Sequence, residues 1–96
     1  MFKVAVVGIG EQSWDNILPS LAQITSVSTV ATCDIDKNKA DLAAVKYGAK
    51  SYCDYNLMIE NEELDAIIVA SYPDVHYKVA KLALERGIAI FIEKPP

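Results

Sequence analysis

Five short apolar segments, rich in β-branched residues, recur along the chain and alternate with stretches in which apolar residues have helical spacing. A continuous apolar run with little alternation is typical of a strand that is covered on both faces of a parallel sheet. The predicted strands are 2–7, 27–33, about 49–53, 64–71 and 88–93. This pattern predicts an α/β protein.

Four helical stretches lie between the predicted strands. The first is predicted at 17–25, and it starts late because Pro19 fits only within a first turn, which leaves Asp15 or Asn16 as its cap. The other three are predicted from Asp36 to Gly48, from Asp54 or Asn56 to Glu60, and from about Val75 to Gly87 with Asp74 as the cap.

Short turns join these elements, so a parallel sheet with right-handed crossovers is the natural arrangement. The predicted fold class is α/β: a doubly wound parallel sheet of the Rossmann type, with five strands in the order 3-2-1-4-5 and helices on both faces. The length of 96 residues, without a repeat or linker, predicts one dinucleotide-binding domain over residues 1–96.

Composition narrows the choice of partners. Hydrophobic residues make up 52% of the chain, charged residues make up 23%, and the net charge is −4 with scattered basic residues. Nucleic-acid binding needs a basic patch, and a membrane span needs roughly 18 to 20 consecutive apolar residues. The sequence has neither feature and begins without a signal peptide. We therefore expect a cytoplasmic protein that binds neither nucleic acid nor membranes.

The two cysteines, Cys33 and Cys53, lack metal-ligand spacing, and the chain has one histidine, His76. A metal site needs more ligands, and a disulfide needs an oxidising compartment. The cysteines are therefore predicted to be reduced, half-buried thiols.

A glycine-rich turn, Gly8-Ile9-Gly10, stands between the first strand and the first helix. In a dinucleotide-binding fingerprint the first glycine permits a tight turn, and the second lets the backbone approach a pyrophosphate. The third glycine is missing: Ser13 stands at its position, and residues 11–15 make the turn longer and more acidic than usual. A structural turn without a ligand remains the alternative.

An acidic residue, Asp34, follows the second strand. A carboxylate there can accept hydrogen bonds from both hydroxyls of an adenosine ribose, whereas a 2′-phosphate would meet its negative charge. NAD is therefore favoured over NADP. The alternative is that Asp34 satisfies only loop backbone, and Asp36 is explained better as a helix cap.

Two further polar segments follow strands at the same edge of the sheet. Residues 71–76 would line the nicotinamide side of a cofactor, although a backbone-bonded imidazole is the simpler interpretation of His76. Glu93 and Lys94 form either a surface ion pair or, beside a cofactor, a site where the lysine relays a proton or holds a substrate hydroxyl. Sequence motifs of hydrolases and of phosphoryl-transfer enzymes are missing, so redox chemistry is the favoured class of function.

Four blocks together resemble the Gfo/Idh/MocA oxidoreductases, a family that includes glucose-fructose oxidoreductase and inositol dehydrogenase. The blocks are residues 4–10, 31–36, 65–71 and 93–95. The resemblance implies an NAD(P)-binding Rossmann domain. In the family a larger domain normally follows, with the substrate pocket, a catalytic histidine or aspartate and the oligomer interface. We expect that C-terminal domain to be absent from this chain.

The resemblance also implies roles for individual residues. Lys94 corresponds to the active-site lysine and is the expected catalytic residue. The expected cofactor-binding residues are Gly8, Ile9, Gly10 and Ser13 at the phosphate turn, Asp34 at the ribose, and Ser71, Pro73, His76 and Glu93 on the nicotinamide side. No metal is implied. Ser13 and the Tyr72-Pro73 pair depart from the family pattern, which puts the fit of the cofactor in doubt.

The leading hypothesis is an NAD(P)-dependent oxidoreductase that transfers a hydride between nicotinamide C4 and a carbinol or carbonyl carbon of a sugar, cyclitol or related polyol. We expect the 96-residue chain to bind the cofactor without turnover, and the parent enzyme to be a homo-oligomer. The alternatives are a non-catalytic nucleotide-binding or redox-sensing module, and a structural half whose sheet edge pairs with another chain.

Overall fold

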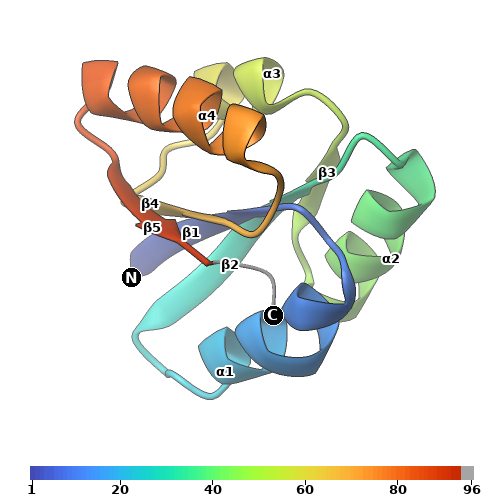
Figure 1. Cartoon of the computed structure of the whole chain (residues 1–96). Coiled ribbons are helices and arrows are strands. Elements are labelled where there is room, and N and C mark those ends of the chain that lie inside the picture. Colours follow the sequence, from blue (N-terminus) through green and yellow to red (C-terminus); the bar gives the residue numbers. More distant parts are fainter. Residues whose placement is uncertain (94–96) are drawn as a thin grey trace.

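A parallel sheet lies at the centre of the molecule, with helices on both of its faces (Figure 1). This computed structural model describes residues 1–93. The five strands are β1 (Phe2–Val7), β2 (Val27–Cys33), β3 (Lys50–Tyr52), β4 (Ala66–Val69) and β5 (Ala89–Ile92). Their order is β3-β2-β1-β4-β5, and every neighbouring pair is parallel. The predicted fold class and strand order are confirmed.

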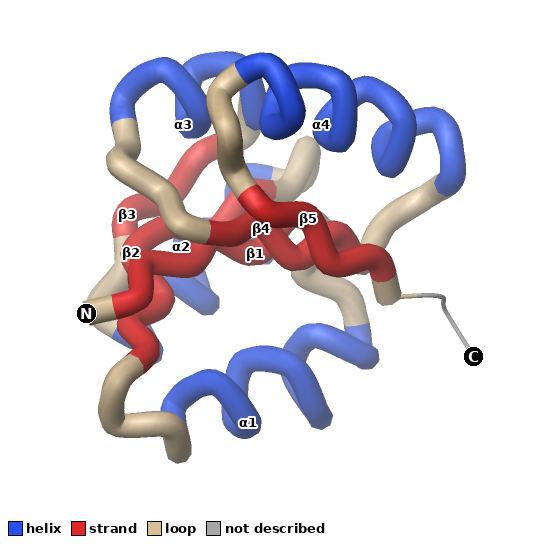
Figure 2. The backbone as a smooth tube through the Cα atoms, turned by 90° about the vertical axis from the view of Figure 1, so that its left-hand side faces the viewer, coloured by secondary structure: helices blue, strands red, loops and turns tan. Residues whose placement is uncertain are grey.

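The helical elements are η1 (Ser13–Ile17), α1 (Leu18–Ala22), α2 (Lys37–Tyr47), α3 (Tyr55–Asn61) and α4 (Pro73–Glu85). Figure 2 shows α3 and α4 on one face of the sheet and α1 on the other. No helix in residues 1–93 has the length and apolar character that a bilayer crossing requires.

Alternate residues of β1 belong to two hydrophobic cores. Ala5 and Val7 face the core that contains the buried side chains of α3 and α4. Val6 faces the other core, together with Leu18 and Ala43 from the helices of the opposite face. Because both faces of β1 are covered from Val4 to Val7, this part of the strand is continuously apolar, as the pattern predicted.

The predicted caps of α2 and α3 are confirmed. The Asp36 carboxylate accepts a hydrogen bond from the Asn38 N–H at 3.0 Å, and that of Asp54 accepts one from the Asn56 N–H at 2.8 Å. Gly48 ends α2 in the left-handed conformation, with φ of 68°. These ends were predictable because each depends on a few adjacent residues.

The prediction that the first helix starts late is wrong. Helical structure begins directly after Gly10 and runs through a π-helical turn, η1, into α1. Asp15 and Asn16 therefore lie inside the helical run and do not cap it. Pro19 follows the π turn, in which the Leu18 N–H donates to the Ser13 carbonyl. A wider turn relieves the clash that a proline ring makes in a regular α-helix.

Asp74 was also predicted as a cap, and this is wrong. Tyr72 is the N-cap of α4, and Pro73 occupies the first helical position, where its fixed φ fits and its missing N–H costs nothing. Asp74 lies in the first turn, where its charge is favourable to the helix dipole.

The fourth and fifth strands are shorter than predicted, although backbone hydrogen bonds continue by one residue past their ends. Before β4, the Asp65 carboxylate accepts a hydrogen bond from the Lys3 N–H at 2.7 Å. After β4, the chain turns away at Ala70, whose N–H still donates to the Val7 carbonyl at 2.8 Å.

Candidate functional site

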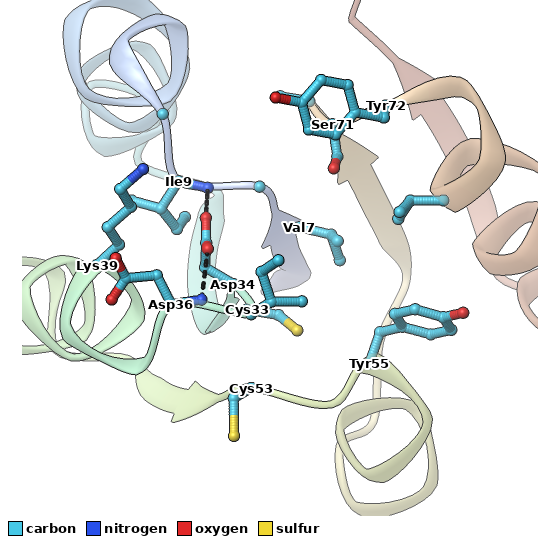
Figure 3. Close-up of a pocket in the computed structure, with 15 residues that line it drawn as sticks. Val7, Ile9, Cys33, Asp34, Asp36, Lys39, Cys53, Tyr55, Ser71 and Tyr72 are labelled. Carbon is cyan, nitrogen blue, oxygen red and sulfur yellow. Dashed lines mark hydrogen bonds between the residues drawn. The ribbon is translucent and has the colours of Figure 1, made fainter.

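A cleft of about 450 Å³ opens at the carboxyl ends of β1, β2 and β4 (Figure 3). Its walls come from three segments that are far apart in sequence: residues 7–10, residues 33–36 and residues 70–72, with Lys39, Cys53, Tyr55 and Val75 completing the lining. The chain leaves β1 toward β2 and later returns to place β4 on the other side of β1, so the cleft lies at the switch point of the sheet. Open α/β sheets bind their ligands at this point.

The first glycine of the turn is required by the fold. Gly8 has φ of +95°, and a Cβ built on it would lie 2.3 Å from the Ala70 carbonyl oxygen. The turn therefore presses against the chain that leaves β4. The Gly8 N–H donates to the Cys33 carbonyl at 2.8 Å, and this hydrogen bond also fixes the turn to the end of β2.

The second glycine is not required by packing. A Cβ on Gly10 would meet nothing within 4 Å, and its φ is not positive. Gly10 lines the cleft, so the open space beside it is part of the cleft. This is the feature expected where backbone must come close to a pyrophosphate.

The neighbours of these glycines have structural tasks. Ile9 is only 1% exposed and packs in the core with Leu18, so it forms part of the cleft wall with almost no free surface. Ser13 is fully buried, and its hydroxyl donates to the Gly8 carbonyl at 2.5 Å. Ser13 therefore stabilises the turn from beneath and does not line the cleft.

Asp34 links two loops. Its Oδ2 accepts a hydrogen bond from the Ile9 N–H at 2.8 Å, and its Oδ1 accepts one from the Asp36 N–H at 2.8 Å (Figure 3). Each carboxylate oxygen has a second lone pair, so the side chain can satisfy loop backbone and still accept hydrogen bonds from a ligand. The two roles weighed from the sequence are compatible.

The segment after β4 is only partly in the cleft. Ser71 and Tyr72 line it, whereas Pro73 and His76 do not. The Nε2 atom of His76 is buried and makes no hydrogen bond within residues 1–93. The simple interpretation of a backbone-bonded imidazole therefore does not hold for this atom.

Glu93 lies apart from the cleft. Its N–H donates to the Val69 carbonyl at 2.9 Å, which extends the pairing of β5 with β4 by one residue. Glu93 lines a second hollow of about 280 Å³ beside α1, together with Gln12 and Phe91. Lys94, the expected catalytic residue, lies outside the described residues.

The two thiols differ, contrary to the expectation that both are half-buried. Cys33 is 2% exposed, and burial, followed by the negative charge of Asp34, raises the pKa of its thiol to about 12. Cys53 is exposed at the rim of the cleft. Both are free, and residues 1–93 contain no group of three or more potential metal ligands.

A thiol reagent at pH 8 should therefore modify Cys53 and leave Cys33 unmodified until the protein unfolds. With a pKa of about 12, roughly one Cys33 side chain in 10⁴ is a thiolate at that pH. Intact-protein mass spectrometry after timed labelling would count the modified thiols. Rapid double labelling of the folded protein would contradict this assignment and would revive the redox-sensing alternative.

The sequence did not reveal Lys39 and Tyr55 as lining residues. Lys39 could have been found, because it stands in the first turn of the helix that Asp36 was predicted to cap, directly after the predicted ribose ligand Asp34. No sequence pattern marked Tyr55 as a lining residue, because its place in the cleft depends on how the chain packs between β3 and α3.

The fold and the site together define a dinucleotide-binding Rossmann domain: a glycine turn with room beside Gly10, a carboxylate at the end of β2, and a cleft at the switch point. The chain belongs to the Gfo/Idh/MocA oxidoreductases, because residues 2–96 match the model of this family, described as an oxidoreductase family with an NAD-binding Rossmann fold.

Similar proteins agree with this assignment. The chain is 34% identical over 95 residues to an inositol 2-dehydrogenase of Salmonella paratyphi B, with 97% of this chain and 28% of that protein covered. A dehydrogenase from Chromobacterium violaceum superposes with a TM-score of 0.92 at 35% identity, covering 100% of this chain and 28% of that one. A myo-inositol 2-dehydrogenase from Lactobacillus plantarum gives 0.86 at 27% identity, with 98% and 28% covered. The chain thus spans less than a third of the length of these relatives.

Proposed function

We propose that this chain is the cofactor domain of an oxidoreductase that moves a hydride between NAD and a CH–OH group of a cyclitol, sugar or related polyol. The observation that carries the proposal is the fixed Asp34 carboxylate beside the open space at Gly10. Together they offer a hydrogen-bond acceptor for a ribose and room for a pyrophosphate in one cleft. The substrate class is suggested by the inositol 2-dehydrogenases among the relatives.

Different residues of the cleft are assigned to different parts of the cofactor. Gly10 gives the pyrophosphate access to backbone, Asp34 holds the adenosine ribose, and Ser71 lies across the cleft on the side where the nicotinamide belongs. When bound, the nicotinamide supplies the carbon that accepts or donates the hydride. We assign to Lys94 the orientation of the substrate oxygen and the transfer of its proton. Pro73, His76 and Glu93 do not line the cleft, and we assign them only an indirect part in shaping that side of the site.

The remaining parts of the proposal concern the parent enzyme. Its substrate pocket and oligomer interface belong to a second domain, so the 96-residue chain binds the cofactor without turnover. We further propose that the enzyme is a cytoplasmic homo-oligomer. Size-exclusion chromatography with light scattering would report the oligomer of a longer chain, and a purely monomeric enzyme would contradict this part.

Calorimetric titration of the 96-residue chain with NADH tests the proposal. The chain should bind NADH, and Gly10→Ala should weaken binding by about tenfold or more, because the added methyl group enters the space beside the pyrophosphate. The melting temperature of the variant should stay within about 3 °C, since its Cβ meets no protein atom.

A folded wild-type chain that does not bind NADH would refute the cofactor assignment. Equal binding by the wild type and Gly10→Ala would refute the role of this glycine. Dehydrogenase activity of the chain with inositol would contradict the claim that a second domain completes the site.

A further inference from the structure

One edge of the sheet exposes apolar residues and free main-chain groups. β5 is the last strand on its side of the sheet, because it pairs with β4 and with no other strand in residues 1–93 (Figure 1). Residues 88–92 are all apolar, and Phe91 and Ile92 are 55% and 48% exposed. An exposed apolar edge strand without charge, proline or bulge is a template on which another strand can pair.

The opposite edge of the sheet is different. β3 forms that edge, and it has only three residues and begins at the exposed Lys50. Short length and a charged side chain, lysine above all, are the features by which edge strands avoid pairing with other chains. The β3 edge is therefore protected, whereas the β5 edge is open.

The outward main-chain groups of β5 belong to alternate residues. The N–H groups of Ala89 and Glu93 donate to carbonyls within residues 65–69, at 3.1 and 2.9 Å, on the side where β4 lies. Successive N–H groups of a strand point to opposite sides, so those of Ile90 and Ile92 point away from β4. A partner at this edge must therefore be an extended strand that offers carbonyls to these two residues.

An antiparallel copy of β5 matches these groups. With the Ile90 residues of the two copies opposite each other, each Ile90 N–H donates to the other Ile90 carbonyl, and each Ile92 N–H meets the Ile88 carbonyl of the other copy. The Ile88 N–H already donates to the Ala83 carbonyl at 2.9 Å, so it needs no partner. Within residues 1–93, β5 is the one strand with an open apolar edge, so a second β5 is the strand that meets the requirement.

Side chains and charges also fit this register. Phe91 of each copy lies opposite the exposed Ala89 of the other, so that a large side chain packs beside a small one. Glu93 of each copy comes opposite Gly87, so the two carboxylates stay apart. Apolar surface that one chain exposes is thus covered by the same surface of its copy.

We propose that this chain forms a two-fold symmetric dimer, in which the β5 strands of two copies pair antiparallel and join both sheets into one. The same edge is used by both copies, so association stops at two. The contact is separate from the oligomer interface assigned to a second domain. The cofactor cleft lies at the ends of β1, β2 and β4 and contains no residue of β5, so it stays open in each copy.

Sedimentation velocity of the 96-residue chain tests the proposal, over concentrations from about 1 to 300 µM, the range of a moderate affinity. The wild type should change from monomer to dimer as its concentration rises. Phe91→Lys should raise the dissociation constant by about tenfold or more, because an edge lysine opposes strand pairing. Val45→Lys is the matched control: it adds the same charge at a residue of α2 that is 84% exposed, and it should leave the dimer unchanged.

Two further variants separate main-chain pairing from side-chain contact. Ile92→Ala keeps the outward N–H, whereas Ile92→Pro removes it and leaves the pairing with β4, which uses the N–H groups of the neighbouring residues. Ile92→Pro should therefore dimerise about tenfold or more weakly than Ile92→Ala, since two hydrogen bonds are lost per dimer. Thermal unfolding of each variant, followed by circular dichroism, would show that the monomer remains folded.

A wild type that remains monomeric across the whole range overturns the proposal, and so does open-ended association into larger species. A dimer that Phe91→Lys does not weaken lies at another surface and overturns it as well. Equal dissociation constants for folded Ile92→Pro and Ile92→Ala would show that strand pairing does not hold the two copies together. None of these outcomes depends on cofactor binding, so the proposed function stands or falls separately.

Discussion

Replacing Gly8 with alanine is expected to lower the melting temperature by more than about 15 °C or to abolish cooperative folding. The new Cβ would lie 2.3 Å from the Ala70 carbonyl oxygen, so backbone has to move at the point where β1 and β4 are joined. Clashes of this kind fall among the exceptional losses of more than about 4 kcal/mol, and each kcal/mol shifts the midpoint of a domain of this size by about 4 to 8 °C. Thermal unfolding followed by circular dichroism would measure the change.

Gly48→Ala is the matched control for this substitution. Gly48 has a similar left-handed φ of 68°, but a Cβ there would meet no atom within 4 Å. It should lose only about 1 kcal/mol from backbone strain. If the two alanine variants lose the same stability, steric contact with Ala70 is not what fixes the glycine turn.

Replacing Asp34 with alanine is expected to reduce NADH affinity by about a hundredfold or more. Charge-assisted hydrogen bonds to the two ribose hydroxyls contribute about 1.5 to 3 kcal/mol each, and both are lost together. The variant also leaves the N–H groups of Ile9 and Asp36 without their acceptor, so its stability falls too. Calorimetric titration below the midpoint of unfolding separates the two effects.

Asp54→Ala provides the comparison for the loss of stability. Asp54 accepts a backbone N–H at the start of α3 much as Asp34 does in its loop, but it does not line the cleft. Removing this cap should cost about 1 kcal/mol and leave NADH affinity unchanged. NADH binding by Asp34→Ala at wild-type strength would mean that this carboxylate serves the loops alone.

Local signals made much of the fold predictable. β2 was predicted with its observed bounds, and Asp36, Asp54 and Gly48 were identified as helix ends, because apolar runs and caps are properties of a few neighbouring residues. The first helix was mispredicted for the same reason. The rule that proline opens a helix is local, whereas the π turn before Pro19 is a property of the whole helical run.

The candidate site was predictable to a lesser extent. Gly8, Gly10, Asp34 and Ser71 line one cleft, because they follow strands whose carboxyl ends meet at the same edge. Ser13 and Glu93 also follow strands that end at this edge, but neither lines the cleft. Ser13 lies beneath the glycine turn, and Glu93 lines the hollow beside α1. Side-chain direction at a turn depends on packing that no spacing rule contains.

The double attachment of Asp34 has a consequence for the redesign of cofactor preference. Exchanging an acidic residue at the end of β2 for a neutral one is the direct way to admit a 2′-phosphate. In this domain that exchange would also release the Ile9 N–H of the phosphate turn. A successful redesign should therefore keep an acceptor for the Ile9 N–H, for example the single amide oxygen of Asp34→Asn, and add positive charge elsewhere in the loop. Selectivity and scaffold are coupled through one side chain, so they have to be engineered together.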